Sequence, residues 1–537
     1  MSLTAEPRTS STDLASAPTG SARIDAARLR DLAARITTGP GERESMEIVN
    51  PATGQRLGAT PRCTAADIEL AARQAASAQE RWARTSFAHR REILLRFHDL
   101  VLERQDELLD VIQLESGKAR RHAFEEILDT ALVARYYANT AQDHLRVHRR
   151  RGALPMLTAT WEYHHPVGIV GVISPWNYPL TLSLSDAVPA LAAGNAVIIK
   201  ADSKTPFSAL VGLEVLEAAG LPAHLLQVVT GSGAQLGPEI ISRVDFVMFT
   251  GSTATGRQVA AQAAERLIPS SMELGGKNAM LVLEDANLNR AVDGAERAMF
   301  SNAGQLCISI ERLLVHERIA AQFIDRLVAR VGKMRLGVGL SYDFDMGSLI
   351  SAEQLQAVSR HVDDAVAAGA RVLVGGKARP DIAPYYYEPT LLQGVGQDME
   401  IFATETFGPV ASIATFATEE EAVARANDSC YGLNFSLWTR DTARGRYLAT
   451  RLKAGTVNVN EGYVATWGSV DAPMGGMKDS GLGRRHGAAG IVKYTEAQTV
   501  SVQRLMPIAP PPRVKTELWA SAMTQSLRLL RRLPGVR

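Results

Sequence analysis

The middle of the chain alternates between strand-like and helix-like patterns. Runs of consecutive apolar residues, typical of buried strands, occur at 167–173, 196–199, 226–229 and 246–249. Helical stretches separate them, and one of these, 208–219, ends at a Gly-Leu-Pro turn. Strands and helices that alternate at this spacing predict an α/β protein with a parallel, doubly wound sheet.

A second block of the same kind follows the first. It begins with strand-like runs at 271–274 and 279–283, continues through a helix at 320–331 and a strand at 371–374, and ends near Asn458. Because 537 residues are too many for one core, we expect at least two domains. The two blocks therefore predict two doubly wound parallel sheets.

The segments outside these blocks have other patterns. Residues 64–145 are helical, with Thr64 at the N-cap position. Near 144–165 the chain becomes basic and then strand-like. The tail, 505–537, contains three consecutive prolines and then a basic amphipathic stretch. For this stretch we favour a helix that packs on this subunit or a neighbour over one that lies on an anionic membrane.

Composition narrows the function classes. The formal net charge of +1 gives no reason to expect a nucleic-acid partner. No run of 18 apolar residues occurs, so no membrane span is expected. Residues 1–22 are rich in Ser, Thr, Ala and Pro, which predicts a disordered leader. The three cysteines are widely spaced and no Cys/His cluster has metal-ligand spacing, which predicts no metal site and favours a reducing, cytoplasmic location.

The candidate chemistry centres on Cys307, which follows a Gly-Gln turn between apolar flanks. A lone cysteine is usually a small buried hydrophobe. Three other stretches, however, each isolate one polar side chain, Asn177, Glu273 or Glu405, in an apolar or Gly/Pro-rich setting. A thiol nucleophile, an amide donor and a carboxylate base are the groups that acyl transfer through a thioester requires.

These stretches resemble, in the same order, the motifs of the aldehyde dehydrogenase family. They are PWNYP at 175–179, GSTATG at 251–256, MELGGK at 272–277, SNAGQLCIS at 301–309, ETFGP at 405–409 and PMGGMKDSG at 473–481. Any one of them is a weak signal, but six in family order are specific, and the resemblance extends from about residue 48 to about residue 500.

The resemblance implies a domain organisation. An NAD(P)-binding domain is expected at 23–143 and 167–277, and a catalytic domain at 278–478. An arm at 144–166 and 490–504 would add to a neighbouring subunit's sheet, giving a homodimer or homotetramer.

The proposed chemistry assigns one role to each catalytic residue. The Cys307 thiolate adds to an aldehyde, and oxidation leaves a thioester that water hydrolyses to the acid. Asn177 and the backbone N–H of Cys307 would stabilise the oxyanion. Glu273 would be the base for the hydrolytic water, and its apolar neighbours predict a raised pKa.

The resemblance also implies a nicotinamide cofactor. The residues expected to bind it are Trp176, Lys200, Ser203, Gly251, Ser252, Gly256, Leu274, Glu405 and Phe407. NAD-preferring members usually carry a glutamate three residues after the lysine. Here that position is Ser203, which can donate to a 2′-phosphate, so NADP is expected and NAD is the alternative. The glycine-rich turn 231–237 is either a pyrophosphate clamp or a plain strand-to-helix turn.

The local sequence around Cys307 and at 483–487 is similar to NADP-linked succinate-semialdehyde dehydrogenases. Tyr178, Ser185, Ser301, Trp467 and Ser469 are expected at the substrate, in a tunnel that we interpret as apolar to neutral. The arginines that better-known relatives place near Ser185 and Ser301 are absent. Broad aliphatic or aromatic specificity, a coenzyme A-acylating dehydrogenase and a binding protein without turnover are the alternatives.

Overall fold

The computed structural model describes residues 23–152, 158–504 and 509–532, so the leader expected at 1–22 lies outside the described residues. The chain forms two compact units. One runs to His144 and from Pro166 to Tyr494, and the other contains Leu145–His165 and the residues from Thr495 onward. Both predicted sheets lie in the first unit.

The first sheet has the order β19-β9-β8-β5-β6-β7. Its strands are β5 (Ile169–Ile173), β6 (Ala196–Lys200), β7 (Leu226–Val229), β8 (Phe246–Thr250), β9 (Ser270–Glu273) and β19 (Gly481–Leu482). All pair in parallel except β19, which pairs antiparallel with β9. The chain runs outward from β5 to β7 and then returns to β8 on the other side of β5. This reversal makes the gap between β5 and β8 a topological switch point.

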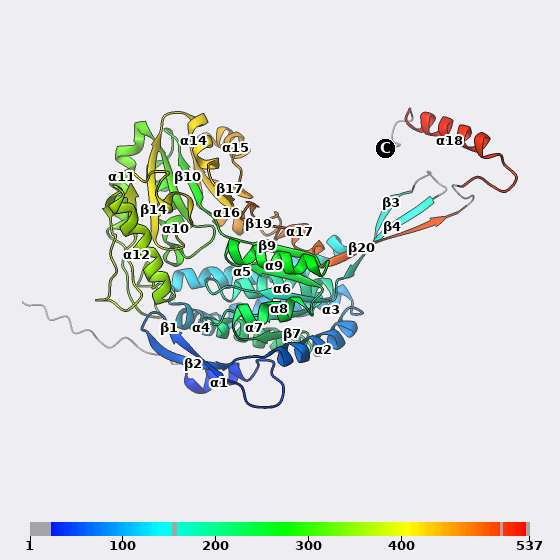
Figure 1. The fold of residues 1–537 in the computed structure, drawn as a ribbon, viewed down its shortest axis with the longest axis horizontal. Helices are drawn as coiled ribbons and strands as arrows, with labels where there is room; N and C mark the ends of the chain where they lie inside the picture. Colours follow the sequence, from blue (N-terminus) through cyan, green and yellow to red (C-terminus); the bar gives the residue numbers. More distant parts are fainter. Residues whose placement is uncertain (1–22, 153–157, 505–508, 533–537) are drawn as a thin grey trace, which may run out of the picture. The chain divides into compact units, whose positions relative to one another are not determined.

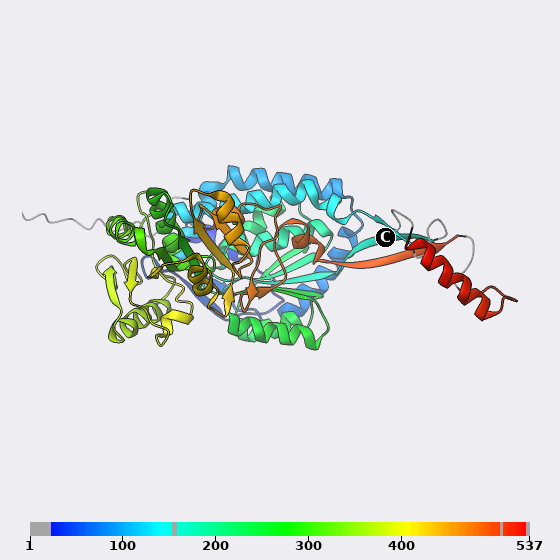
Figure 2. The ribbon, with the colours of Figure 1, turned by 90° about the horizontal axis from the view of Figure 1, so that it is seen from above.

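Helices cover both faces of this sheet, as a doubly wound fold requires (Figures 1 and 2). One layer contains α2 (Ala65–Trp82), α8 (Gly233–Ile241) and α9 (Thr253–Glu265), and the other contains α6 (Thr181–Ala193), α7 (Pro206–Ala218) and α3 (Phe87–Glu103). Every residue of β5, β6, β7 and β8 is buried. Burial on both faces is why these strands appear as unbroken apolar runs in the sequence.

The second sheet has the order β12-β13-β14-β11-β10-β16-β17, with only β12 antiparallel. Its strands are β10 (Asn278–Val282), β11 (Ile310–His316), β12 (Arg371–Val374), β13 (Thr390–Gln393), β14 (Val410–Phe416), β16 (Asn434–Trp438) and β17 (Thr456–Val459). In β10, Met280 and Val282 join one core cluster, whereas Ala279 and Leu281 join another. The sheet is therefore also buried on both faces, with α10 (Leu288–Phe300) and α11 (Glu317–Val331) on one side and α14 (Glu419–Asn427) and α15 (Thr442–Ala449) on the other.

The helical region predicted at 64–145 divides into α2, α3, α4 (Gln105–Ser116) and α5 (Arg120–Leu145). The predicted N-cap of α2 is confirmed, because the Asp67 carboxylate accepts the Thr64 N–H at 2.7 Å. The remaining elements of the first unit are α1 (Ala26–Ala33), β1 (Ser45–Asn50), β2 (Gln55–Pro61), η1 (Ser301–Gly304), α12 (Ala352–Ala367), α13 (Glu400–Ala403), β15 (Tyr431–Gly432), α16 (Val464–Trp467), β18 (Met477–Lys478) and α17 (Gly487–Val492).

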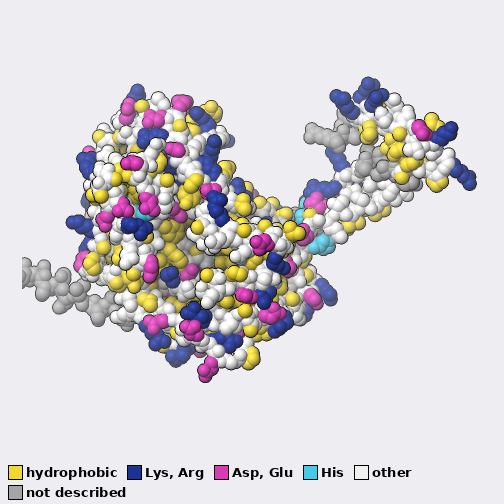
Figure 3. Space-filling view, in the orientation of Figure 1, with side chains coloured by type: hydrophobic (Ala, Val, Ile, Leu, Met, Phe, Trp, Pro, Cys, Tyr) yellow, Lys and Arg dark blue, Asp and Glu magenta, His cyan; other side chains and the backbone are white. Residues whose placement is uncertain are grey.

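The second unit contains a three-stranded sheet and a terminal helix. The sheet has the order β20-β4-β3, from β3 (His148–Arg151), β4 (Thr158–Pro166) and β20 (Thr495–Gln503). The amphipathic stretch expected in the tail forms α18 (Thr516–Leu530), in which no residue is buried. Basic and hydrophobic side chains are exposed together on this helix (Figure 3).

On the face of the first unit seen in Figure 3, basic and acidic side chains are interspersed, in keeping with the net charge of +1. Among the helices of the described ranges, none combines the length and the apolar character needed to cross a membrane.

Candidate functional site

Cys307 lies in a strained turn between α10 and β11. Three consecutive residues, Asn302, Ala303 and Gly304, adopt left-handed backbone angles, with φ of 50°, 53° and 69°. Such angles are costly for residues with a Cβ and persist only where the surroundings enforce them. At Gly304 an added Cβ would lie 2.0 Å from the carbonyl oxygen of Gly408, so only glycine fits there.

Buried amide side chains fix the backbone of this turn. Gln305 Nε2 donates to the Asn302 carbonyl at 3.1 Å, and its Oε1 accepts the Ile350 N–H at 2.9 Å. Asn278 Nδ2 donates to the Cys307 carbonyl at 2.7 Å and to that of Ser309 at 2.8 Å. The hydrogen bond from Asn278 therefore fixes the backbone of Cys307, which limits movement of its thiol.

Asn177 follows β5 and reaches the same turn. Its Nδ2 donates to the Gln305 carbonyl at 3.0 Å. Its backbone carbonyl accepts from Asn302 Nδ2 at 2.9 Å and from Lys118 Nζ at 2.6 Å. An amide nitrogen has two hydrogens, so after the bond to Gln305 one remains as a donor.

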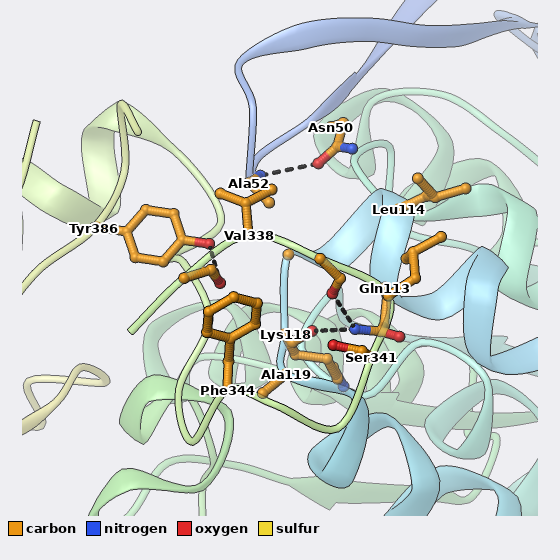
Figure 4. A pocket seen from close by; sticks show the side chains of 14 residues that line it. Asn50, Ala52, Gln113, Leu114, Lys118, Ala119, Val338, Ser341, Phe344 and Tyr386 are labelled. Atoms are coloured by element: carbon orange, nitrogen blue, oxygen red, sulfur yellow. Dashed lines mark hydrogen bonds between the residues drawn. The ribbon is translucent and has the colours of Figure 1, made fainter. Parts of the chain in front are cut away.

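Lys118 supports Asn177 from a distant part of the chain. Its ammonium group is completely buried and forms an ion pair with Glu126 at 2.6 Å. Its backbone lies at the cavity shown in Figure 4, where Gln113 Nε2 donates to the Lys118 carbonyl at 3.3 Å and to that of Gly339 at 3.1 Å. The sequence analysis missed Lys118 and Glu126, because neither stands in a recognisable motif.

Glu273 ends β9 and is 6% exposed. Its Oε1 has no hydrogen-bond partner among the described residues. Burial raises the pKa of Glu273 to about 7, against the opposing charges of Arg485 and Lys493. The raised pKa expected from the sequence is thus confirmed. The backbone of Gly475 lies beside this carboxyl, because a Cβ there would come within 2.9 Å of Oε1.

The Cys307 thiol lies in the same low-dielectric region. Burial raises its pKa to about 12, and the nearby Glu405 and Glu273 carboxyls act in the same direction. Arg485 opposes this effect. The thiol is therefore protonated near neutral pH, so a reaction through its thiolate needs a base to remove the proton.

The expected cofactor residues lie at the carboxyl ends of adjacent parallel strands. Trp176 follows β5, Lys200 ends β6, Gly251 and Ser252 follow β8, and Leu274 follows β9. In doubly wound sheets the ligand crevice lies at these ends, at the switch point, which here is between β5 and β8. The observed placement fits a dinucleotide.

Two local features shape this crevice: a helix cap and a glycine that a leucine packs against. Ser252 Oγ accepts the Thr255 N–H at 3.3 Å and caps α9, whose positive N-terminal end suits a phosphate. Gly256 permits the approach of Leu274, because a Cβ there would lie 2.4 Å from Leu274 Cδ2.

Glu405 faces a pair of glycines. Its Oε1 accepts the Gly276 N–H at 2.9 Å, and a Cβ on Gly275 would come within 2.4 Å of its Oε2. Burial, with the charge of Glu311, raises the pKa of Glu405 to about 8. The other oxygen of this carboxyl, Oε2, can accept a hydrogen bond from a ribose hydroxyl.

Glu311 holds the loop that carries Glu405 and Phe407. Its carboxylate accepts the Thr406 and Phe407 N–H groups, each at 3.0 Å, and forms a buried ion pair with Lys277. The Phe407 ring meets Trp176 edge to face at 5.4 Å. Lys277 ends the MELGGK motif and Glu311 stands two residues after the SNAGQLCIS motif, but their pairing could not be read from the sequence.

The end of β6 carries more basic than acidic groups. Lys200 is buried, which lowers the pKa of its ammonium, and the backbone of Gly233 lies beside it. Asp202 Oδ1 accepts the Lys204 N–H at 2.9 Å, so this carboxylate is bound to its own loop. Within the glycine-rich stretch 231–237, residues 233–237 already form the start of α8, with Gly233 next to Lys200.

A pocket opens at Cys307. Its lining residues are Glu125, Asp129, Tyr178, Thr181, Leu182, Ser185, Leu306, Cys307, Ile308, Tyr463, Trp467, Met474, Arg485 and His486. Tyr178, Ser185 and Trp467, which are expected at the substrate, thus line the same pocket as Cys307. The exposed wall is mostly apolar, as expected, but segments distant in sequence also bring two acidic residues, an arginine and a histidine to it.

The expected serines already have hydrogen-bond partners. Ser185 Oγ donates to Asp129 at 2.6 Å, and Ser301 Oγ lies 2.8 Å from the Tyr463 hydroxyl. Ser301 lines a neighbouring cavity that also contains Arg121 and Phe300. Ser469 is exposed and donates to the carbonyl of Ala465 at 2.6 Å.

Comparison with known proteins agrees with this fold and site. The model of the aldehyde dehydrogenase family matches residues 38–500. A protein of Mycolicibacterium smegmatis, provisionally named succinate-semialdehyde dehydrogenase (NADP+), is 51% identical over 95% of this chain and 98% of its own length. Glutarate-semialdehyde dehydrogenase of Pseudomonas aeruginosa is 36% identical over 84% of this chain and 93% of its own.

Among solved structures, an NADP-dependent enzyme of E. coli has a TM-score of 0.83 and 34% sequence identity, covering 87% of this chain and 97% of its own. The chain belongs to the aldehyde dehydrogenase family, as its motifs indicated.

Proposed function

We propose that this chain oxidises succinate semialdehyde to succinate with NADP, through a thioester on Cys307. Two observations carry the proposal. Asn177 Nδ2 bonds to the turn that leads into Cys307, and the Glu273 carboxyl, whose Oε1 has no partner among the described residues, lies close enough to Cys307 to raise the pKa of its thiol. The names of the two relatives support an aldehyde that also bears a carboxylate.

In the first step the sulfur of Cys307 bonds to the aldehyde carbon, and the thiol proton passes to water in the site. The carbonyl oxygen becomes an oxyanion. Asn177 Nδ2 and the Cys307 N–H donate to it, and a preorganised donor of this kind is worth about 3 kcal/mol. The bonds of Asn177 to Gln305 and Lys118 hold the amide before the substrate arrives.

A bound nicotinamide cofactor would supply the hydride acceptor that oxidation of the thiohemiacetal to the thioester requires. The residues that would hold it are those at the strand ends and the loop that Glu311 fixes. Glu405, anchored by the Gly276 N–H, would accept a hydrogen bond from a ribose hydroxyl. The rings of Phe407 and Trp176 would line the space next to that ribose.

Hydrolysis of the thioester needs a base, and Glu273 has the required properties. With a pKa of about 7, its carboxylate is well populated near neutral pH yet strong enough to take a proton from water. The water oxygen bonds to the acyl carbon, the carbon–sulfur bond breaks, and the sulfur regains a proton. The unpartnered Oε1 supports water, rather than coenzyme A, as the acyl acceptor.

The cofactor preference for NADP rests on the end of β6. Lys200 and Lys204 provide two cationic side chains near Ser203, and the Asp202 carboxylate is bound to the loop backbone. A 2′-phosphate there would meet donors and positive charge.

The location and assembly form part of the same proposal. A cytoplasmic location is supported by the free cysteines at positions 63, 307 and 430, because the mechanism needs a reduced thiol. A homodimer or homotetramer is supported by the β20-β4-β3 sheet, because β20 is exposed along most of its length and can pair or pack with another subunit.

Replacing Glu273 with glutamine should separate acylation from hydrolysis. If Glu273 mainly activates water, Glu273→Gln should still release about one reduced cofactor per site in a rapid burst, and steady-state turnover should fall about 10²–10⁴-fold. Stopped-flow absorbance measures both phases. Loss of the burst would instead assign Glu273 to thiol activation.

In the wild type, turnover should fall as the pH drops below about 7, because the Glu273 carboxyl becomes protonated.

Replacing Ser203 with glutamate should shift the preference toward NAD. The new carboxylate would accept from the ribose hydroxyls of NAD and repel a 2′-phosphate, shifting relative binding by roughly 1–3 kcal/mol. Ser203→Gln, of the same length without the charge, is the matched control. An unchanged NAD-to-NADP efficiency ratio in the glutamate variant, or a wild type that already prefers NAD, would contradict the assignment.

The substrate is tested by comparing succinate semialdehyde with butanal, which has the same chain without the carboxylate. We expect a higher kcat/KM for succinate semialdehyde, measured by NADPH absorbance. A higher kcat/KM for butanal would refute the semialdehyde assignment and favour a general apolar-aldehyde dehydrogenase.

A further inference from the structure

Two basic side chains in the Cys307 pocket have unsatisfied nitrogen atoms. Arg485 Nε and His486 Nδ1 are buried and have no hydrogen-bond partner in the described ranges of the chain. Both residues line the pocket together with Cys307. Buried polar atoms are nearly always paired, so two unpaired nitrogens beside one pocket indicate that a ligand completes them.

Arg485 is held in place through one end of its guanidinium group. Its Nη2 donates to Asp186 Oδ2 at 2.6 Å and to Thr250 Oγ1 at 2.7 Å. The other oxygen of Asp186 lies 3.7 Å from Lys493 Nζ. Two basic residues thus share one buried carboxylate, and Nε of Arg485 is left as a charged donor.

The acidic residues of the pocket are bound to hydroxyl groups. Glu125 accepts from the hydroxyls of Tyr178 at 2.8 Å and Tyr463 at 2.7 Å, and burial raises its pKa. Asp129 Oδ2 accepts from Ser185, while its Oδ1 is unpartnered among the described residues. Burial lowers the pKa of His486, against the charge of Asp129. These contacts leave Arg485 as the donor best suited to a carboxylate.

We propose that Arg485, assisted by His486, binds the carboxylate of the substrate while its aldehyde faces Cys307. This inference rests on the proposed function and names the group that recognises its substrate class. A guanidinium Nε–H forms a directional, charge-assisted hydrogen bond to a carboxylate oxygen. Ser185 and Ser301, which stand where better-known relatives have arginines, already bond to Asp129 and Tyr463. In this proposal Arg485 takes over the role of those arginines.

The test compares two aldehydes in variants of Arg485. The ratio of kcat/KM for succinate semialdehyde to that for butanal should fall about 10–100-fold in Arg485→Gln, mainly through KM of the semialdehyde, because one charged hydrogen bond is lost. Arg485→Lys keeps a charge for Asp186 but removes Nε, and should give a smaller fall. Circular dichroism and NADP binding show whether each variant is folded.

Lys493→Gln is the matched control. It removes the other basic group on Asp186 but is not among the residues that line the pocket. It should change the efficiencies for both aldehydes by similar factors and leave their ratio close to that of the wild type.

The outcomes separate the two proposals. A wild type that prefers butanal overturns the proposed substrate, and with it this subsite. A wild type that prefers succinate semialdehyde, with the same ratio in folded Arg485→Gln, overturns only the subsite. An equal fall in the ratio for Lys493→Gln would also overturn it, because the effect would then belong to the whole charge cluster.

Discussion

Burial of ionisable groups is the constraint on which this site depends. Cys307, Glu273 and Glu405 lie in one water-poor region, and burial pushes their pKa values to about 12, 7 and 8. The Cys307 thiol and the Glu405 carboxyl are thereby biased toward neutral forms near physiological pH, whereas Glu273 is divided between its neutral and charged forms. Glu273 can therefore both hold and release a proton at the pH where the enzyme works.

Such a site would be unstable without compensating charges around it. The structure supplies buried pairs at its edges, with Lys118 and Glu126 behind Asn177 and Lys277 and Glu311 behind the Glu405 loop. Breaking one partner of such a pair typically costs several kcal/mol, because a charge is left unpaired. The pairs therefore position the reacting groups, although none is expected to touch the substrate.

The sequence predicted the sheets well, because strands buried on both faces appear as unbroken apolar runs. The apolar neighbours of Glu273 also predicted its raised pKa. The sequence could not predict edge strand β19, which has two residues and no pattern. The pairing of β19 with β9 brings the segment around Gly475 and Arg485 next to Glu273. Arg485 and His486 were missed at the pocket for that reason, whereas Glu125 and Asp129 come from α5, which is far from Cys307 in the sequence.

The central claim is that Cys307 carries the acyl group. The most direct measurement is acid quenching of the Glu273→Gln protein mixed with NADP and succinate semialdehyde, followed by peptide mass spectrometry. The account predicts a succinyl group on the peptide that contains Cys307, dependent on NADP, and none on the peptides with Cys63 or Cys430. Cofactor reduction without an acyl group on Cys307, or sustained turnover by Cys307→Ala, would contradict it.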